Sequence, residues 1–203
     1  MAGKSLVAFE SLTTEGKEVA VHADLTDEGQ TVRIPEIHTT ATDKVTGDHD
    51  GVVAKETTVL DEVFYKNLIL GKEYTVSGKL MVKETGEPLT IDGKEVTAEK
   101  TFVAEEADGS IILEFTFDSS ALAGKSLVAF ETLYTEEKEV AVHADITDEG
   151  QTVRIPEIHT TATDKVTGDH DGVVAKETTV LDEVFYTNLI PGKEYTVSGK
   201  LLS

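Results

Sequence analysis

Four short segments of this sequence contain side chains that could carry out acyl-transfer chemistry. They hold threonine hydroxyls, carboxyl groups, an imidazole and a carboxamide, in Thr39–Asp43, Leu60–Tyr65, Val128–Glu131 and His143–Val153. A threonine hydroxyl is a poor nucleophile unless a base removes its proton, and an amide is a poor electrophile unless its carbonyl is polarised. A histidine oriented by a carboxylate can move that proton, and a buried, protonated carboxyl can donate to the oxyanion.

Strand alternation indicates which of these side chains face a core. In an extended strand, residues two positions apart lie on the same face. Thr39 shares its face with Ile37 and Ala41, Asp61 with Val59 and Val63, and Gln151 with Val153 and Ile155. Glu131 lies among Leu127, Ala129 and Leu133, a setting that would raise the pKa of its carboxyl group. For His143 the parity decides nothing, because Ala141 and Val142 are both apolar. Polar side chains on apolar faces are costly unless they satisfy one another, so we expect them to meet.

The elements that must position these residues belong to a tandem repeat. Residues 2–80 recur at 123–201 with only six differences, among them Gly16 against Glu137 and Leu70 against Pro191. One complete repeat is expected at 37–157, preceded by the C-terminal part of another repeat at 1–36 and followed by the N-terminal part of a third at 158–203.

Within the complete repeat the apolar residues alternate with period two between Gly, Asp and Asn turns, which is typical of short antiparallel strands. The expected fold class is all-β, as tandem immunoglobulin-like β-sandwich modules of Greek-key type. Arg154–Ile158 carries one repeat into the next through a proline. Because so short a link leaves little freedom, neighbouring repeats are expected to form a stalk.

Composition excludes several classes of function. The formal charge of -21 repels nucleic acid and anionic membrane surfaces, and no apolar run is long enough to span a bilayer. With no cysteine, neither disulfides nor thiolate metal sites can form. We expect no metal and no cofactor: Asp48–Gly51 resembles the start of a calcium loop but lacks the downstream glutamate. His38, His49, His159 and His170 are expected in turns or on the surface.

The four segments, with Asn67–Tyr74 and Gly78–Leu80, resemble in order the VaFE repeat, a threonine-glutamine ester-bond domain of Gram-positive cell-surface adhesins. The resemblance implies a first strand joined to a last strand without enzyme or cofactor. Thr39 would be the nucleophile, Gln151 its target, and Asp61, Glu131 and His143 the supporting groups. On the chemistry above we assign His143 as the base; which of the two carboxyl groups keeps a proton is left open.

The resemblance also implies where the protein is located. It implies an extracellular, cell-wall-anchored surface protein whose export signal and anchor lie outside this sequence. Its partners would be neighbouring repeats, and the ligand that such an adhesin binds is not indicated. Because each repeat reacts once, it is not an enzyme.

The two incomplete repeats carry complementary parts of the same set. The first holds Glu10, His22 and Gln30, and the last holds Thr160 and Asp182. These parts raise the hypothesis of an ester between chains that joins copies head to tail. The equivalents of residues 83–122 would be missing from such a composite, which would leave open sheet edges.

Two other functions use the same residues differently. One is an uncrosslinked adhesive or ligand-binding sandwich in which they form a buried polar network. The other is a hydrolase that uses His143 and Asp61.

Overall fold

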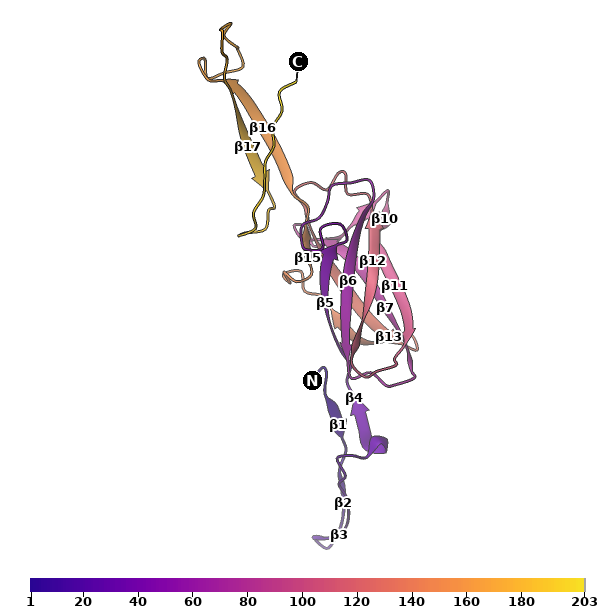
Figure 1. The fold of residues 1–203 in the computed structure, drawn as a ribbon. Helices are drawn as coiled ribbons and strands as arrows, with labels where there is room; N and C mark the ends of the chain where they lie inside the picture. The colour runs from indigo at the N-terminus through magenta and orange to yellow at the C-terminus, as the bar shows by residue number, and fades with distance from the viewer. Residues whose placement is uncertain (203) are drawn as a thin grey trace.

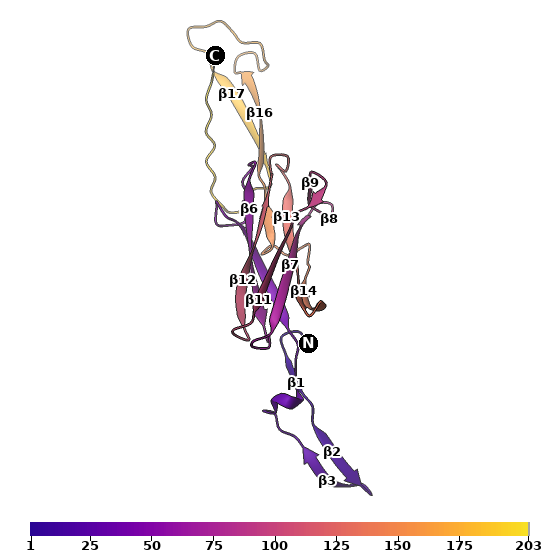
Figure 2. The ribbon, with the colours of Figure 1, turned by 90° about the vertical axis from the view of Figure 1, so that its right-hand side faces the viewer.

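The computed structural model describes residues 1–202 and has three parts in a line (Figure 1). A central β-sandwich is flanked at one end by a ribbon formed by the N-terminal residues and at the other by a hairpin formed by the C-terminal residues (Figure 2). The described residues include no α-helix, only one short 3-10 turn, η1 (Glu28–Gln30). The all-β fold class is thus confirmed. No segment among these residues forms a helix able to cross a membrane.

Two antiparallel sheets make the sandwich. The smaller sheet has the order β12-β6-β5, with β12 at Gly109–Phe117, β6 at Thr57–Lys66 and β5 at Glu36–Asp43. The larger has the order β11-β7-β13-β14, with β11 at Thr97–Val103, β7 at Glu73–Val82, β13 at Ser126–Thr135 and β14 at Lys138–His143. Strand β15 (Thr152–Arg154) pairs with β13, β8 (Glu87–Pro88) pairs with β7, and β9 (Thr90–Ile91) pairs with β10 (Lys94–Glu95). Strand β5 begins at Glu36, one residue before the expected start of the repeat.

Alternating sequence produces alternating burial in these strands. In β6 every second residue is buried, from Thr57 to Tyr65, and the residues between them are more exposed. The buried side chains of both sheets form one apolar core that includes Val63, Leu80 and Phe115. Burying such side chains contributes roughly 1.5 to 3 kcal/mol each, which is the main driving force for closing the two sheets on each other.

At Gly78 of β7, side chains of the opposite sheet lie close to the backbone. A Cβ atom there would lie 2.7 Å from Leu113 and 2.7 Å from Phe115, both on β12 of the opposite sheet. Those side chains occupy the space that any larger residue at position 78 would need, so this glycine sets the spacing of the sandwich next to Glu131, its partner in the β7-β13 register.

The first and last segments of the sandwich meet at one edge. The amide of Ala41 in β5 donates to the carbonyl of Gly150 at 2.9 Å. Just beyond, the Arg154 amide donates to the His49 carbonyl at 2.7 Å, and the Gly51 amide donates to the Arg154 carbonyl at 2.6 Å. The chain thus closes the sandwich by laying its last residues beside its first strand.

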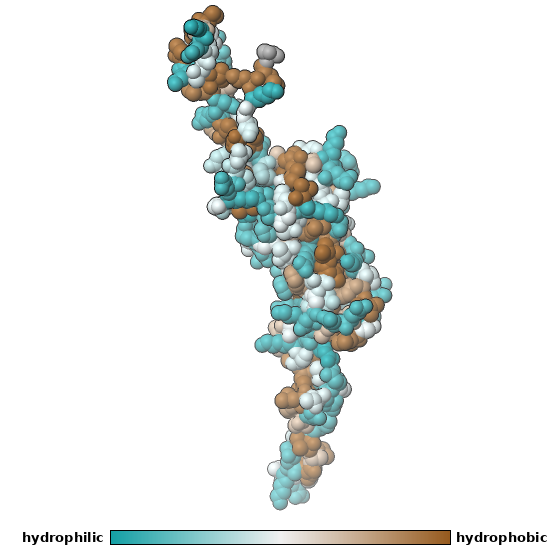
Figure 3. All heavy atoms as spheres, in the orientation of Figure 1, coloured by the Kyte–Doolittle hydropathy of each residue, from teal (hydrophilic) through white to brown (hydrophobic). Residues whose placement is uncertain are grey.

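The flanking parts repeat elements of the sandwich without its core. The first contains β1 (Ser5–Val7), β2 (Glu10–Thr14), β3 (Lys17–His22) and β4 (Thr31–Arg33); the last contains β16 (Glu157–Asp164) and β17 (Val180–Thr187). Leu12 is 63% exposed, whereas its equivalent in the sandwich, Leu133, is fully buried. Apolar side chains accordingly lie open along both flanking parts (Figure 3). In the complete repeat, the equivalent apolar faces are covered by the rest of the sandwich.

We predict that Gly78→Ala destabilises the protein by about 1 to 3 kcal/mol, because the added methyl group overpacks the core between the sheets. Urea unfolding measures the change. Ser77→Ala, on the outward face of the same strand, is the matched control and should change stability by less than about 0.5 kcal/mol. Equal stability of the two variants would contradict this account of Gly78.

Candidate functional site

Four of the expected site residues are enclosed in the sandwich. Thr39 is 5% exposed, Glu131 is 1% exposed, and Asp61 and Gln151 have no exposed surface. Each lies on the inward face of its strand or segment, as the alternation of the sequence predicts. Three titratable or hydroxyl groups and a carboxamide therefore share an interior from which water is excluded.

Strand pairing brings Thr39 and Asp61 together on the smaller sheet. In the β5-β6 register, Thr39 lies opposite Val63 and Asp61 lies opposite Ala41. Thr39 and Asp61 are therefore diagonal neighbours on one face, a relation that spans about 7 Å between Cα atoms. Across the sandwich, the Thr39 hydroxyl Oγ1 donates to Glu131 Oε2 at 3.1 Å. One buried hydrogen bond thus links the two sheets through the expected nucleophile.

Gln151 lies between the first strand and β13. The carbonyl of the preceding residue, Gly150, accepts from Ala41, and the carbonyl of Gln151 itself accepts from Ala129 at 3.3 Å. Ala41 is two residues from Thr39 and Ala129 is two residues from Glu131, so each alanine shares a face with the site residue beside it. The backbone thus holds Gln151 beside the two strands that carry Thr39 and Glu131, and its side chain is buried.

Several polar atoms in this region have no hydrogen-bond partner. Among the described residues, such buried atoms include both oxygens of Asp61, Oε1 of Glu131, and both Oε1 and Nε2 of Gln151. An unpaired buried polar group costs about 1 to 3 kcal/mol. A proton shared between Glu131 and Asp61 would satisfy their carboxyl atoms, and a hydrogen bond between these two side chains indeed contributes to both of their pKa values. The Gln151 carboxamide is left without a partner.

The two carboxyl groups have different proton affinities. Burial raises the pKa of Asp61 to about 6, while its neighbours Glu131, Thr39 and His143 act to lower it. Burial raises the pKa of Glu131 further, to about 10, and the adjacent charge of Asp61 adds to the rise. The pair therefore shares one proton near neutral pH, and that proton resides on Glu131. This answers the question that the sequence left open.

His143 stands at the rim of this site. It ends β14 directly opposite Glu131 in the β13-β14 register, and its side chain is 20% exposed. Its Nε2 atom lies 2.9 Å from Asp148 Oδ2. A carboxylate in this position fixes the orientation of the imidazole ring.

Sequence reasoning missed Asp148. The signal was the spacing of five residues between histidine and aspartate, which recurs in the first repeat. There His22 Nε2 lies 2.8 Å from Asp27 Oδ2 although no sandwich surrounds it. The pair is therefore a local feature of the turn that joins β14 to Gln151.

That turn is held by its own hydrogen bonds. Asp148 Oδ1 accepts from the Gly150 amide at 2.8 Å, and the Thr152 hydroxyl donates to the Asp148 carbonyl at 2.6 Å. Glu149 is paired with Lys83 Nζ at 2.6 Å and with Arg154. The backbone on either side of Gln151 is thus fixed before its side chain does any chemistry.

The counterparts in the incomplete repeats are not assembled. Glu10 lies opposite His22 in the β2-β3 register, as Glu131 lies opposite His143, and Gln30 ends η1. Thr160 and Asp182 lie on the β16-β17 hairpin, at the other end of the molecule (Figure 1). All but the partly exposed Gln30 are exposed. An ester between chains remains a prediction.

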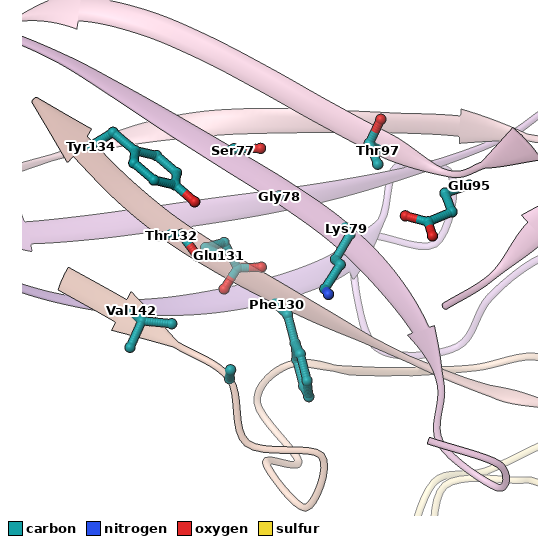
Figure 4. Close-up of a pocket in the computed structure, with 11 residues that line it drawn as sticks. Ser77, Gly78, Lys79, Glu95, Thr97, Phe130, Glu131, Thr132, Tyr134 and Val142 are labelled. Carbon is teal, nitrogen blue, oxygen red and sulfur yellow. The ribbon is translucent and has the colours of Figure 1, made fainter. Parts of the chain in front are cut away.

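A depression of about 390 Å³ lies on the larger sheet, beside strands β7 and β13 (Figure 4). Its lining includes Ser77, Lys79, Phe130 and Glu131, but neither Thr39 nor Gln151. The threonine and the carboxamide therefore face the closed interior and not this depression. Among residues 1–202, no group of three or more His, Asp or Glu side chains could hold a metal ion.

Comparison with known proteins gives a family match over the whole chain. The model of the "T-Q ester bond containing domain" matches three consecutive segments, at residues 1–34, 35–155 and 156–203. No curated protein matches.

Two solved structures of an adhesin from Mobiluncus mulieris are similar in fold. They are described as containing intramolecular disulfide, isopeptide and ester bond cross-links. Their TM-scores are 0.52 and 0.51, at 14% identity, and each comparison covers 76% of both chains.

The raised pKa values predict how stability depends on pH when Thr39 is replaced by alanine. Both folded pKa values exceed the ordinary 3.8 of Asp and 4.5 of Glu, so the folded state holds its protons more tightly. The contribution of these groups is complete below about pH 4 and is lost as pH rises through about 6 and then about 10. Urea unfolding of Thr39→Ala between pH 4 and 10.5 measures the loss. Adding Glu131→Gln, a neutral isostere, should remove the loss of stability that occurs as pH rises toward about 10. If that loss keeps its full size in the double variant, the proton is not on Glu131.

Proposed function

The chain belongs to the family of T-Q ester bond containing domains, and from this premise we propose that the central repeat closes on itself through an ester between Thr39 and Gln151. Such a bond would join strand β5 to the segment before β15. The ester would make the repeat a self-crosslinked module of a bacterial surface adhesin.

The proposed reaction begins with the Thr39 hydroxyl. Its oxygen attacks Cδ of Gln151, and His143 takes its proton; the tetrahedral intermediate then expels Nε2, which leaves as ammonia with that proton. The products are one ester and one ammonia. No cofactor takes part, and because the residues are consumed in the bond, the module turns over once and is not an enzyme.

The supporting groups have separate tasks. Neutral Glu131 accepts the Thr39 hydrogen bond at Oε2, and the proton that it shares with Asp61 would be available for the developing oxyanion of Gln151. Anionic Asp61 would stabilise the imidazolium that forms on His143, consistent with the effect of His143 on the pKa of Asp61. Asp148 would hold that imidazole in place.

The observation that carries this proposal is that one closed sandwich buries both the Thr39 hydroxyl and a carboxamide, that of Gln151, that has no hydrogen-bond partner. Gln151 has no exposed surface and neither of its side-chain polar atoms has a partner. A glutamine kept only for structure would be selected to form hydrogen bonds there. Condensation converts this unpaired amide to an ester, which has no N–H group to satisfy. The same dry interior protects the ester from hydrolysis.

The bond would serve a mechanical purpose. It connects the beginning and the end of the repeat, so tension applied to the chain would load a covalent bond instead of separating strands. Repeats joined in series would then form a protease-resistant stalk displayed outside the cell and anchored to the wall. The adhesin fold shared with the Mobiluncus protein supports this placement.

Intact mass separates this proposal from the alternatives. An uncrosslinked binding sandwich retains its full mass, and a hydrolase keeps its mass while it turns over added ester substrates. The ester lowers the mass of the chain by one ammonia.

We predict that Thr39→Ala and Gln151→Ala each abolish the loss of one ammonia and lower the free energy of unfolding by about 4 to 5 kcal/mol. This value is the free-energy equivalent of the conformational entropy that the unfolded chain loses when a loop of about 110 residues is closed, by analogy with a disulfide. Mass spectrometry of the denatured chain and urea unfolding are the measurements. Gln30→Ala, the same change in the incomplete first repeat, is the matched control and should leave the mass loss unchanged. Full, uncrosslinked mass in the unaltered protein would refute the proposal.

We predict that Asp148→Ala slows ester formation on the order of 10²-fold or more, because His143 loses the group that orients it for proton transfer. The rate is followed as the mass loss over time after refolding from urea. Asp27→Ala, at the equivalent position of the first repeat, should leave the rate unchanged. A normal rate in Asp148→Ala would show that His143 needs no partner.

A further inference from the structure

The three parts of the chain meet at two joints that have the same sequence. The first joint links the incomplete first repeat to the sandwich, and the second links the sandwich to the last hairpin (Figure 2). The complete repeat comes after the first joint and before the second joint in the chain. A contact found at both joints is therefore independent of which neighbour is complete.

An asparagine occupies each joint in a left-handed backbone conformation. Asn67 has φ 65° and Asn188 has φ 63°. Asparagine tolerates this conformation better than most residues with a side chain. At Asn67 the backbone amide also donates to Asp108 Oδ1 at 2.8 Å, which holds the loop of the complete repeat in place. This conformation accompanies a side chain that reaches into the preceding repeat.

Both the nitrogen and the oxygen of each asparagine carboxamide form hydrogen bonds across the joint. At the first joint, Asn67 Nδ2 donates to the Ile34 carbonyl at 3.3 Å and its Oδ1 accepts from the Ser5 hydroxyl at 3.0 Å. At the second joint, Asn188 Nδ2 donates to the Ile155 carbonyl at 3.2 Å and its Oδ1 accepts from the Ser126 hydroxyl at 3.0 Å. Asn188 also donates to the carbonyl of Lys125 at 2.7 Å.

A glycine completes the receiving surface. The amide of Gly3 donates to the Ile34 carbonyl at 3.0 Å, and that of Gly124 donates to the Ile155 carbonyl at 2.8 Å. Both glycines have positive φ, and a Cβ atom on either would lie within 2.8 Å of a carboxylate oxygen from Glu36 or Glu157. The isoleucine carbonyl is thus fixed in direction before the asparagine binds it.

The ion pairs across the second joint have no possible counterpart at the first, because the incomplete first repeat does not include the residues equivalent to Asp48 and Asp50. Lys193 Nζ pairs with Asp48 and Asp50 of the sandwich, each at 2.5 Å, whereas its equivalent Lys72 pairs with Glu136 of its own repeat at 3.5 Å. These ion pairs therefore depend on which parts are present. The serine, the isoleucine carbonyl and the asparagine are the constant elements.

We propose that Asn67 and Asn188 are docking residues that lock each repeat onto the end of the preceding one. The serine hydroxyl and the isoleucine carbonyl form the receiving site, and the next repeat of the same chain is the partner. Replacing the asparagine by aspartate would remove the donor to the isoleucine carbonyl. Replacing it by glycine would allow the same left-handed backbone conformation but remove both side-chain contacts. The lock sets the angle between repeats and does not depend on the ester.

Spin-label distances test the lock directly, because the chain has no cysteine of its own. Labels are placed through Val32→Cys in β4 and Glu99→Cys in β11, which lie on opposite sides of the first joint. We expect one narrow distance distribution, broadened about twofold or more by Asn67→Gly and by Asn67→Asp, because unlocked domains of one chain move relative to each other. Ser5→Ala should broaden it as well. An equally narrow distribution in these variants, or a broad one without them, would overturn the proposal.

Two controls separate the joint from the rest of the molecule. A label pair within the sandwich, Lys79→Cys with Glu114→Cys, should keep its distance in Asn67→Gly, and a change there would mean that the variant disturbs the fold. Intact mass of the same samples reports the ester independently, so failure of the lock and failure of the crosslink are distinguishable. Asn188→Gly with labels at Glu99→Cys and Glu183→Cys repeats the test at the second joint.

Discussion

The structure depends on keeping one cluster of polar groups dry. Thr39, Asp61, Glu131 and Gln151 come from both sheets and from the last segment of the repeat, and they share one interior. An apolar core could tolerate them only if the sandwich is fully closed around them and if they interact with one another. The Thr39–Glu131 hydrogen bond fixes the first strand to β13, and the Ala41–Gly150 backbone bond fixes it to the segment that carries Gln151. The shifted proton affinities follow from the same exclusion of water.

Much of this arrangement could be predicted from sequence because it follows from strand alternation. The period of two placed Thr39, Asp61 and Gln151 on inward faces, and the structure buries all three. The location of the shared proton could not be predicted, since it depends on how deeply each carboxyl is buried and on the distance between them. Asp148 was missed for another reason: its partner His143 lies near a strand end, where alternation carries no information.

The duplicated sequence separates local from tertiary causes. His22 and Asp27 keep their pairing in a ribbon without a core, as do the hydrogen bonds of the turn that leads to Gln30. This turn is therefore determined by its own residues. By contrast, Leu12 and Leu133 have the same immediate strand pairing but opposite exposure, because only the second has an opposing sheet. The turn that leads to Gln151 therefore forms from its own residues, whereas burial of the inward-facing side chains requires the opposing sheet.

The short joint has a consequence for which threonine reacts. Strands β5 and β16 have identical sequences, so Thr160 is chemically equivalent to Thr39, yet it follows Gln151 by only nine residues instead of preceding it by 112. Loop-closure entropy alone would favour the nearer threonine by about 2 kcal/mol. The link through Pro156 and the bonds of Asn188 direct β16 away from the sandwich (Figure 1). In the proposed crosslinking reaction, the joint would thereby keep Thr160 of the next repeat away from Gln151.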